Sequence, residues 1–530
     1  MDPPSADFPM KMRAFFTPDK LKPQHRCLRF HMSTIEIGAR ETHPGWAALL
    51  GGRNAVYSVI LAGGVTLHAL NIYIVTTIMP SIVGDIGGLE YYAWSTTLFV
   101  VASILGAALS SRLLDRVGPG RAYASATALF AAGAVICAAA PAFPMLLAGR
   151  FVQGLGGGLL LTLAYAVVRL VYPAALWSHA IGLISAMWGV STLVGPAVGG
   201  VFAELGIWRA AFWSLVPLSV IFGTIAIAVL PRGSRDKAEG PSPLPLPQLA
   251  LLTASVVAVS AGGVSLNPLW NGAGLVLAGL MAALLLRAEL NGRARLLPKG
   301  ALDTGGRLVA LYATIALLVA GMQTDIFVPY FLQVLHGQSP LIAGYLAALM
   351  AMGWTLGSML SAGRSGEAGI RAIRTGPGFV LAGLVVLLFF VPVAGGVGLQ
   401  LVPICAGLLL AGLGIGVTWP HLVTNVFKES PVSEQGLAAG SITTVQLCAT
   451  AFSAAAAGMV ANLGGLSDPG GAEGASGAAR LLFGVFLVAP ALSLVSVRRL
   501  AGRRNPETAA EAAVVANISR CGPSTSPIAD

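Results

Sequence analysis

The stretch GVSTLVGPAVGG, residues 189–200, decides the fold class of this chain. It lies within a longer apolar run, residues 180–202, which is long enough to cross a lipid bilayer as a helix. Glycine and proline weaken a helix in water, but membrane helices tolerate both. Small residues let neighbouring backbones approach, and partners re-satisfy the carbonyl that Pro196 frees. The stretch therefore predicts a membrane helix that bends and packs tightly against its neighbours.

The composition of the whole chain agrees with a polytopic membrane protein. Of its 530 residues, 55% are hydrophobic and 10% are charged, whereas about 25% are charged in a soluble domain. The net charge of +10 could suit a nucleic acid, but the basic residues lie between apolar spans, so we expect no such partner. The five cysteines show no metal-ligand spacing, and we expect them to be reduced and no metal to bind.

Apolar windows of about 20 residues recur along the chain and predict fourteen spans. Six lie in the first half, six in the second, and two weaker ones, near 248–266 and 270–288, follow a polar, proline-rich break. Two six-span halves about a linker indicate an internal repeat. Met32 is an alternative start to Met1. The predicted organisation is a cytoplasmic, disordered segment 1–56, a bundle 57–230, a linker with two additional spans 231–307, a second bundle 308–497 and a cytoplasmic tail 498–530.

The basic residues also predict the orientation of the spans. With the amino terminus inside, almost all basic residues fall in inner connections, and the outer connections hold only Arg209 and Arg480. This distribution follows the positive-inside rule and favours an even number of spans. We expect Glu204 and Arg209 to pair near the outer face.

The segment SRLLDRVGPGR, residues 111–121, follows the second predicted span. Asp115 and Arg116 supply an acid and a base, Gly118 makes the turn, and Arg121 ends the segment. A carboxylate at a helix end can bond a neighbouring N–H group or arginine in one conformation and release it in another. We interpret the segment as a conformational latch, with an ordinary basic inner loop as the alternative.

The segment RFVQGLGGG, residues 150–158, places Arg150 inside the fourth apolar span. An unpaired arginine at that depth is costly, so it must face water, a partner or the bundle interior. The glycines that follow allow close helix packing. The alternative is that Arg150 extends to the outer surface.

Asp325 is the one acid among 22 that falls well inside an apolar span. Such a group by default marks an ion path or a paired site. At about 1.5 Å per residue, Asp325 and Arg150 both lie in the outer half of the bilayer and could exchange partners there; the alternative is a fixed ion pair. His68, in the first span, titrates in a useful range, although a lone membrane histidine is more often a packing residue.

These segments resemble motifs of the major facilitator superfamily, most closely those of its fourteen-span drug:proton antiporters. Residues 111–121 resemble its loop motif, although Ser111 replaces the usual glycine, and residues 150–158 resemble its fourth-span motif. Asn71 stands where the first-span signature usually has an aspartate, so it cannot take up a proton. The antiporter motif, typical of exporters, is matched by Gly182, Gly195, Pro196, Gly199 and Gly200.

The resemblance implies an all-α major facilitator fold of two six-helix bundles with two extra helices inserted between them. It implies proton coupling through Asp325, Arg150 and His68, and a substrate cavity that includes Asn71 and Gln153. The expected function is proton-driven export of small amphipathic organic compounds, by alternating access, through a bacterial-type cytoplasmic membrane. We expect a monomer in the lipid bilayer, with no cofactor.

Three alternatives remain from the sequence: a dedicated exporter of one metabolite, a proton-coupled uptake carrier of the same fold, and a non-transporting sensor or lipid-handling protein. The chain has no G-x-x-x-x-G-K-[ST] loop, so we do not expect ATP as the direct fuel. Hydrolase patterns are also missing, and we do not expect an enzyme.

Overall fold

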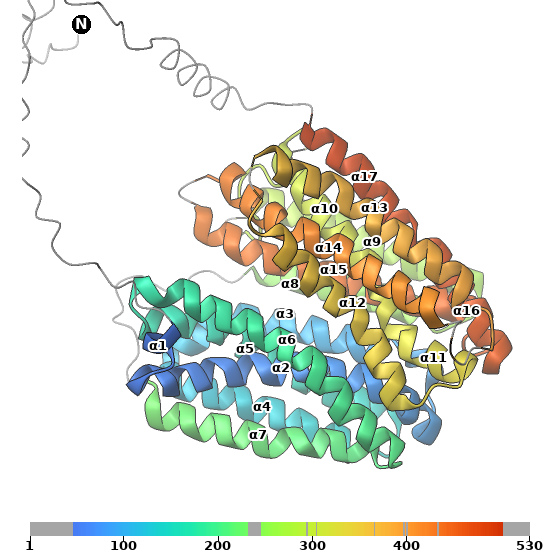
Figure 1. Ribbon diagram of the computed structural model, residues 1–530, viewed down its shortest axis with the longest axis horizontal. Helices are drawn as coiled ribbons and strands as arrows, with labels where there is room; N and C mark the ends of the chain where they lie inside the picture. Colours follow the sequence, from blue (N-terminus) through green and yellow to red (C-terminus); the bar gives the residue numbers. More distant parts are fainter. Residues whose placement is uncertain are drawn as a thin grey trace, which may run out of the picture. The chain divides into compact units, whose positions relative to one another are not determined.

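The computed structural model describes residues 46–231, 245–292, 295–303, 305–364, 366–395, 398, 401–431 and 434–501. Regular structure within these ranges is entirely helical (Figure 1). The predictions for residues 1–45, 232–244 and 502–530 lie outside the described residues. Residues 46–56, which we expected to be disordered, instead form a short helix and the start of the first span.

The first half of the chain contains six long helices, preceded by the short α1 (Trp46–Leu49). Short 3₁₀ turns, η1 (Leu89–Tyr91) and η2 (Ala174–Leu176), connect some of them. The six helices are α2 (Gly52–Ile86), α3 (Trp94–Val117), α4 (Pro119–Ala138), α5 (Phe143–Val171), α6 (Trp177–Glu204) and α7 (Trp208–Val229).

The inserted pair is α8 (Leu246–Gly262) and α9 (Pro268–Asn291). In the second half, two of the six spans are broken. The first consists of α10 (Arg307–Met322), the 3₁₀ turn η3 (Gln323–Phe327) and α11 (Val328–His336), and the last consists of α16 (Gly471–Phe486) and α17 (Val488–Ala501). Between them lie α12 (Pro340–Ser361), α13 (Glu367–Phe390), α14 (Leu401–Glu429) and α15 (Gln435–Leu463).

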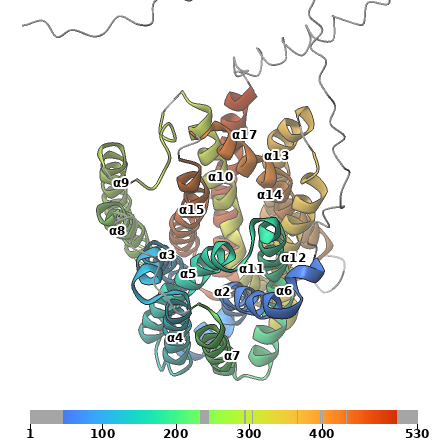
Figure 2. The ribbon, with the colours of Figure 1, turned by 90° about the vertical axis from the view of Figure 1, so that its left-hand side faces the viewer.

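Thirteen spans among the described residues are long and apolar enough to cross a membrane. The fourteenth predicted span corresponds to α8, which is apolar but only 17 residues long. Figure 2 shows α8 and α9 side by side, next to α3 and α15. The all-helical, polytopic fold with an inserted helix pair is therefore confirmed.

The two halves repeat one packing pattern, and glycines set it in both. In the first half α5 packs on α3 and α4, and in the second half α14 packs on α12 and α13. A Cβ atom on Gly158 would overlap the carbonyl of Ser103, and one on Gly412 would overlap the carbonyl of Met350. Only glycine allows backbones to approach this closely, so corresponding helix pairs are held together in the same way.

The two halves meet at the helix ends that the charge pattern predicts to be outer. There α6 and α2 of the first half contact α12 of the second. A Cβ on Gly200 would lie 2.5 Å from Leu341 Cα, and one on Gly344 would lie 2.6 Å from Thr77 Cγ2. The small residues of this region therefore bring the halves together as well as packing each half.

The inserted pair offers a test of topology. Leu269, in the first turn of α9, is 83% exposed, whereas Leu290, at the other end of α9, is 57% exposed. We expect Leu269→Cys to react with an impermeant thiol reagent added to intact cells, and Leu290→Cys to react only after permeabilisation. Mass spectrometry of the labelled chain measures both. Labelling of Leu269→Cys only after permeabilisation would contradict two crossings between residues 246 and 291.

The packing of α6 on α2 offers a test of the glycine stretch. A side chain on Gly195 would overlap Tyr73 Cβ, whereas one on Gly189 would meet no atom within 4 Å. We expect Gly195→Leu to lower stability by about 1–3 kcal/mol, because overpacking displaces neighbouring helices. Gly189→Leu, on the same helix, is the matched control. Equal thermal unfolding temperatures of the two purified variants would show that the close approach is unimportant.

Candidate functional site

Arg150 lies in the interior of the first half with only neutral hydrogen-bond partners. Its side chain is 2% exposed. Nη1 donates to Gln153 Oε1 at 2.6 Å and to Asn71 Oδ1 at 3.2 Å, and Nε donates to the Ser95 carbonyl at 3.4 Å. The guanidinium carbon lies 4.2 Å from the centre of the Phe99 ring, a cation–π contact. A buried cation is thus held by two amides, a carbonyl and an aromatic face.

The glycines of residues 150–158 place Arg150 at this position. Gly154 faces the Phe99 carbonyl on α3, Gly156 faces Phe130 on α4, and Gly157 faces His68 on α2. Because three helices approach α5 through glycine contacts, α5 becomes the centre of the bundle. A side chain one turn from these glycines is therefore surrounded by protein rather than lipid.

Several buried polar atoms around Arg150 have no hydrogen-bond partner among the described residues. They include Asn71 Nδ2, Gln153 Nε2, Ser95 Oγ and His68 Nδ1. The His68 ring lies 5.4 Å from the Phe99 ring and 6.0 Å from the Trp188 ring, centre to centre. The structure thus brings together four of the residues that the sequence singled out: His68, Asn71, Arg150 and Gln153.

Asp325 lies at the break in the first span of the second half. It belongs to η3, where the α-helix changes to a 3₁₀ turn, and Pro329 follows at the start of α11. Proline cannot donate the hydrogen bond that would continue the helix, and a 3₁₀ turn within a helix often marks a hinge. The side chain of Asp325 is partly buried, so an acid stands where the helix is able to bend.

The structure does not bring Asp325 to Arg150. Ion pairs within 4.0 Å in the described part of the chain are Arg209–Asp85, Lys299–Glu434 and Arg307–Glu429, and neither residue belongs to one. The predicted exchange of partners between Arg150 and Asp325 requires another arrangement of the halves and stays a prediction.

The loop motif forms the turn between α3 and α4. Gly118 adopts φ 78°, a conformation that favours glycine, and its N–H bonds the Leu114 carbonyl at 3.0 Å. Asp115, Arg116 and Arg121 are exposed, and Asp115 is in none of the ion pairs of the described residues. Gly118 therefore makes the turn, and the role of the segment as a conformational latch stays a prediction.

The antiporter motif packs α6 against both halves. Gly195 and Gly199 face Tyr73 and Ile74 of α2, and Gly200 faces Leu341 of α12. Gly182 makes a looser contact with Trp46 of α1, 3.4 Å from the position of a Cβ. Pro196 lies inside α6 next to Gly344 of α12.

The expected pair between Glu204 and Arg209 is not present, which corrects the sequence prediction. Arg209 Nη1 donates to Asp85 Oδ2 at 2.7 Å, and Trp208 Nε1 donates to the same oxygen at 3.1 Å. Glu204 instead accepts a bond from the Leu341 N–H at 3.3 Å. Glu204 therefore connects α6 to the second half, and Arg209 connects α7 to the end of α2.

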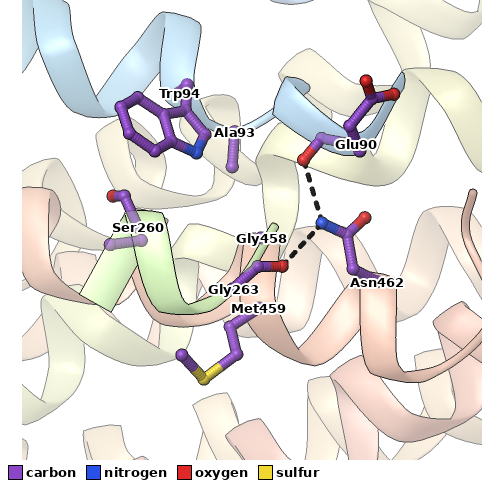
Figure 3. A pocket seen from close by; sticks show the side chains of 9 residues that line it. Glu90, Ala93, Trp94, Ser260, Gly263, Gly458, Met459 and Asn462 are labelled. Carbon is purple, nitrogen blue, oxygen red and sulfur yellow. Dashed lines mark hydrogen bonds between the residues drawn. The ribbon is translucent and has the colours of Figure 1, made fainter. Parts of the chain in front are cut away.

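Sequence reasoning missed Asn462, which joins three segments (Figure 3). It lies near the end of α15, and its Nδ2 donates to the Glu90 carbonyl of η1 and to the Gly263 carbonyl after α8, both at 2.9 Å. The hollow beside it measures about 10 Å³, room for about one water molecule. The only hint in the sequence was an asparagine near the end of a span. Its partners could not be predicted, because they are backbone carbonyls, which every residue has.

The described architecture is that of a polytopic membrane transporter: two repeated halves, two broken spans, a buried arginine in the interior of the first half and a partly buried acid at a break in the second. The family model of the Major Facilitator Superfamily matches residues 61–454. The chain belongs to the major facilitator superfamily.

Named relatives of this chain include multidrug transporters. A Mycobacterium tuberculosis protein (strain H37Rv) named probable multidrug-efflux transporter is 36% identical over 426 residues, which cover 79% of this chain and 89% of that protein. The Bacillus subtilis multidrug transporter protein MdtP is 26% identical over 407 residues, covering 74% and 72%.

Solved structures show the fold of the chain at low sequence identity. The inward open conformation of the xylose transporter XylE from E. coli gives a TM-score of 0.56 at 15% identity, covering 84% of this chain and 96% of that one. A peptide transporter in complex with sulfate gives 0.60 at 15% identity, covering 86% and 96%.

The bonds of Asn462 offer a test of how the outer ends are held. Each hydrogen bond contributes about 0.5–1.5 kcal/mol, so Asn462→Ala is expected to increase the population with separated outer ends severalfold. Spin labels at Leu205 and Val393, both exposed at those ends, report the separation as a distance distribution. Asn425→Ala is the control, because within the described residues the Asn425 side chain bonds the His421 carbonyl of its own helix and no other segment. An unchanged distribution in Asn462→Ala would refute the role.

Proposed function

We propose that this transporter exports small amphipathic organic compounds by proton antiport, with the two halves rocking to expose one site alternately to each side. The observation that carries the proposal is Asp325, a partly buried acid at the break in a spanning segment, without a basic partner within 4.0 Å among the described residues. The names of its relatives support multidrug efflux. We place it, as a monomer, in a bacterial cytoplasmic membrane.

Proton uptake at Asp325 is linked to the contact between the halves. Phe327, two residues later, stacks on Tyr92 of the first half with the ring centres 5.0 Å apart, and Tyr330 lies 5.7 Å from the same ring. A charged carboxylate is costly in the membrane interior, and protonation removes that cost. A change of charge at the hinge therefore alters a segment that packs directly against the opposite half.

The residues around Arg150 in the first half take part in the same transport cycle as Asp325 in the second half. Asn71 cannot take up a proton, so coupling falls mainly on Asp325, with His68 as a second titratable group in the first half. Arg150 holds its two amide partners in the present arrangement. As the halves move, Asp325 approaches Arg150 when charged and leaves it when protonated. In this proposal Asn71 and Gln153, which are buried beside Arg150 in the present arrangement, line the substrate path when the halves move.

The test of proton coupling is Asp325→Asn in proteoliposomes with an imposed pH gradient. We expect efflux of a fluorescent amphipathic dye to fall to the level of protein-free liposomes, because asparagine matches aspartate in shape but cannot carry a proton. Glu473→Gln is the control, since Glu473 is exposed in the first turn of α16.

Size-exclusion profiles of both variants check that folding is intact. Pumping by Asp325→Asn against a dye gradient at the rate of the unmodified chain would exclude Asp325 as the coupling site. Full activity without any pH gradient, in the unmodified chain, would refute proton antiport itself.

A further inference from the structure

The cluster around Arg150 carries a full positive charge and no negative charge. Arg150 is 2% exposed, and its bonds go to Asn71, Gln153 and the Ser95 carbonyl, all of them neutral. The acid Asp325 is on the other half of the chain and is not within ion-pair distance. An isolated buried charge is expensive, so a compensating group is favoured wherever one can reach it.

Two of the unpartnered atoms of the cluster are amide hydrogen-bond donors. Asn71 and Gln153 are each 0% exposed, and their amide nitrogens, Nδ2 and Nε2, have no acceptor among the described residues. Both amide oxygens bond the same atom, Nη1 of Arg150, which keeps the two NH₂ groups beside the guanidinium. The two amide groups therefore have free donors beside the guanidinium, and no carboxylate lies within ion-pair distance of Arg150 among the described residues.

We propose that Arg150, Asn71 and Gln153 form a binding site for an anionic group. A monovalent anion balances the charge of Arg150 and accepts hydrogen bonds from both amides. It thereby removes the free-energy cost of the unpaired buried charge and that of the unpaired buried donors. Two sources have this chemistry: a small anion from solution, and the carboxylate of a transported compound. The inference goes beyond proton antiport, because the site binds its anion whether or not protons drive transport.

The position of the site favours a small or planar anionic group. Phe99 covers one side of the guanidinium at 4.2 Å, and the rings of His68 and Trp188 lie next to it. Because Arg150 is 2% exposed and Asn71 and Gln153 are 0% exposed, a bulky polyhydroxylated anion is disfavoured at this position. Chloride and benzoate are therefore suitable probes for the two sources, and gluconate is the control for ionic strength.

The experiment measures thermal unfolding of the purified full chain while chloride or benzoate replaces gluconate at constant ionic strength. We expect a saturable rise in unfolding temperature, because a ligand that binds only the folded state stabilises it. A rise with chloride identifies a small free anion as a ligand, and a rise with benzoate alone identifies an organic carboxylate.

Variants that add a carboxylate beside Arg150 make the test specific. Asn71→Asp and Gln153→Glu each supply an internal negative charge at the positions that bond Nη1, so the concentration for half-saturation is expected to rise at least tenfold in both. Asn425→Asp makes the same chemical change on α14 and is expected to keep the response. Asp325→Asn should also keep it, which separates anion binding from proton coupling.

No rise with either anion in the unmodified chain would overturn the proposal. An undiminished response in both Asn71→Asp and Gln153→Glu would also overturn it, since an anion bound elsewhere is indifferent to those charges. Two independent variants keep the result interpretable if one of them does not fold.

Discussion

A cation buried in a membrane helix is the constraint around which the first half is built. Arg150 cannot remain among lipid chains, so the helix that carries it must be enclosed by other helices. Glycines at 154, 156 and 157 make that enclosure possible, because α3, α4 and α2 each approach α5 through one of them. The same contacts bring Asn71 and Phe99 to the guanidinium. The same glycine contacts therefore pack the helices closely and bury the charge of Arg150.

The internal repeat separates an acid from a base. Asp325 lies about as far from the start of its span as Asn71 does from the start of α2, so the two occupy corresponding places in the two halves. In α14, the helix that corresponds to α5, a buried leucine, Leu408, stands at the level of Arg150. At these corresponding interior positions, the first half therefore holds a base, Arg150, without an acid, and the second half holds an acid, Asp325, without a base. Interaction between them depends on how the halves are placed.

The contact between the halves contains no ion pair among the described residues. Glu204 and Asn462 bond backbone groups, Gly200 and Gly344 approach the opposite half closely, and Tyr92 stacks on Phe327. A typical hydrogen bond of this kind contributes about 0.5–1.5 kcal/mol, and one to a charged group somewhat more. An interface of this kind holds one arrangement without making it permanent, which suits a protein whose halves must move relative to each other.

The sequence by itself determined the features that depend on local composition. Apolar length predicts a membrane span because a bilayer requires about 20 residues to cross it, and the glycine stretches indicate close helix contacts because only small residues permit them. It also selected Arg150, Asn71, Gln153 and His68. It did not reveal that they form one cluster, nor that the span of Asp325 breaks at that residue.

Tertiary structure decided the partners. Arg209 bonds Asp85, which lies 124 positions away in the chain, rather than the nearby Glu204. Asn462 reaches backbone carbonyls of two other segments, and Arg150 bonds amides instead of Asp325. Hydrogen bonds and ion pairs act over about 3–4 Å. Which groups come this close depends on how the helices are packed in space. The residue pattern along one helix does not give the distances between side chains on different helices.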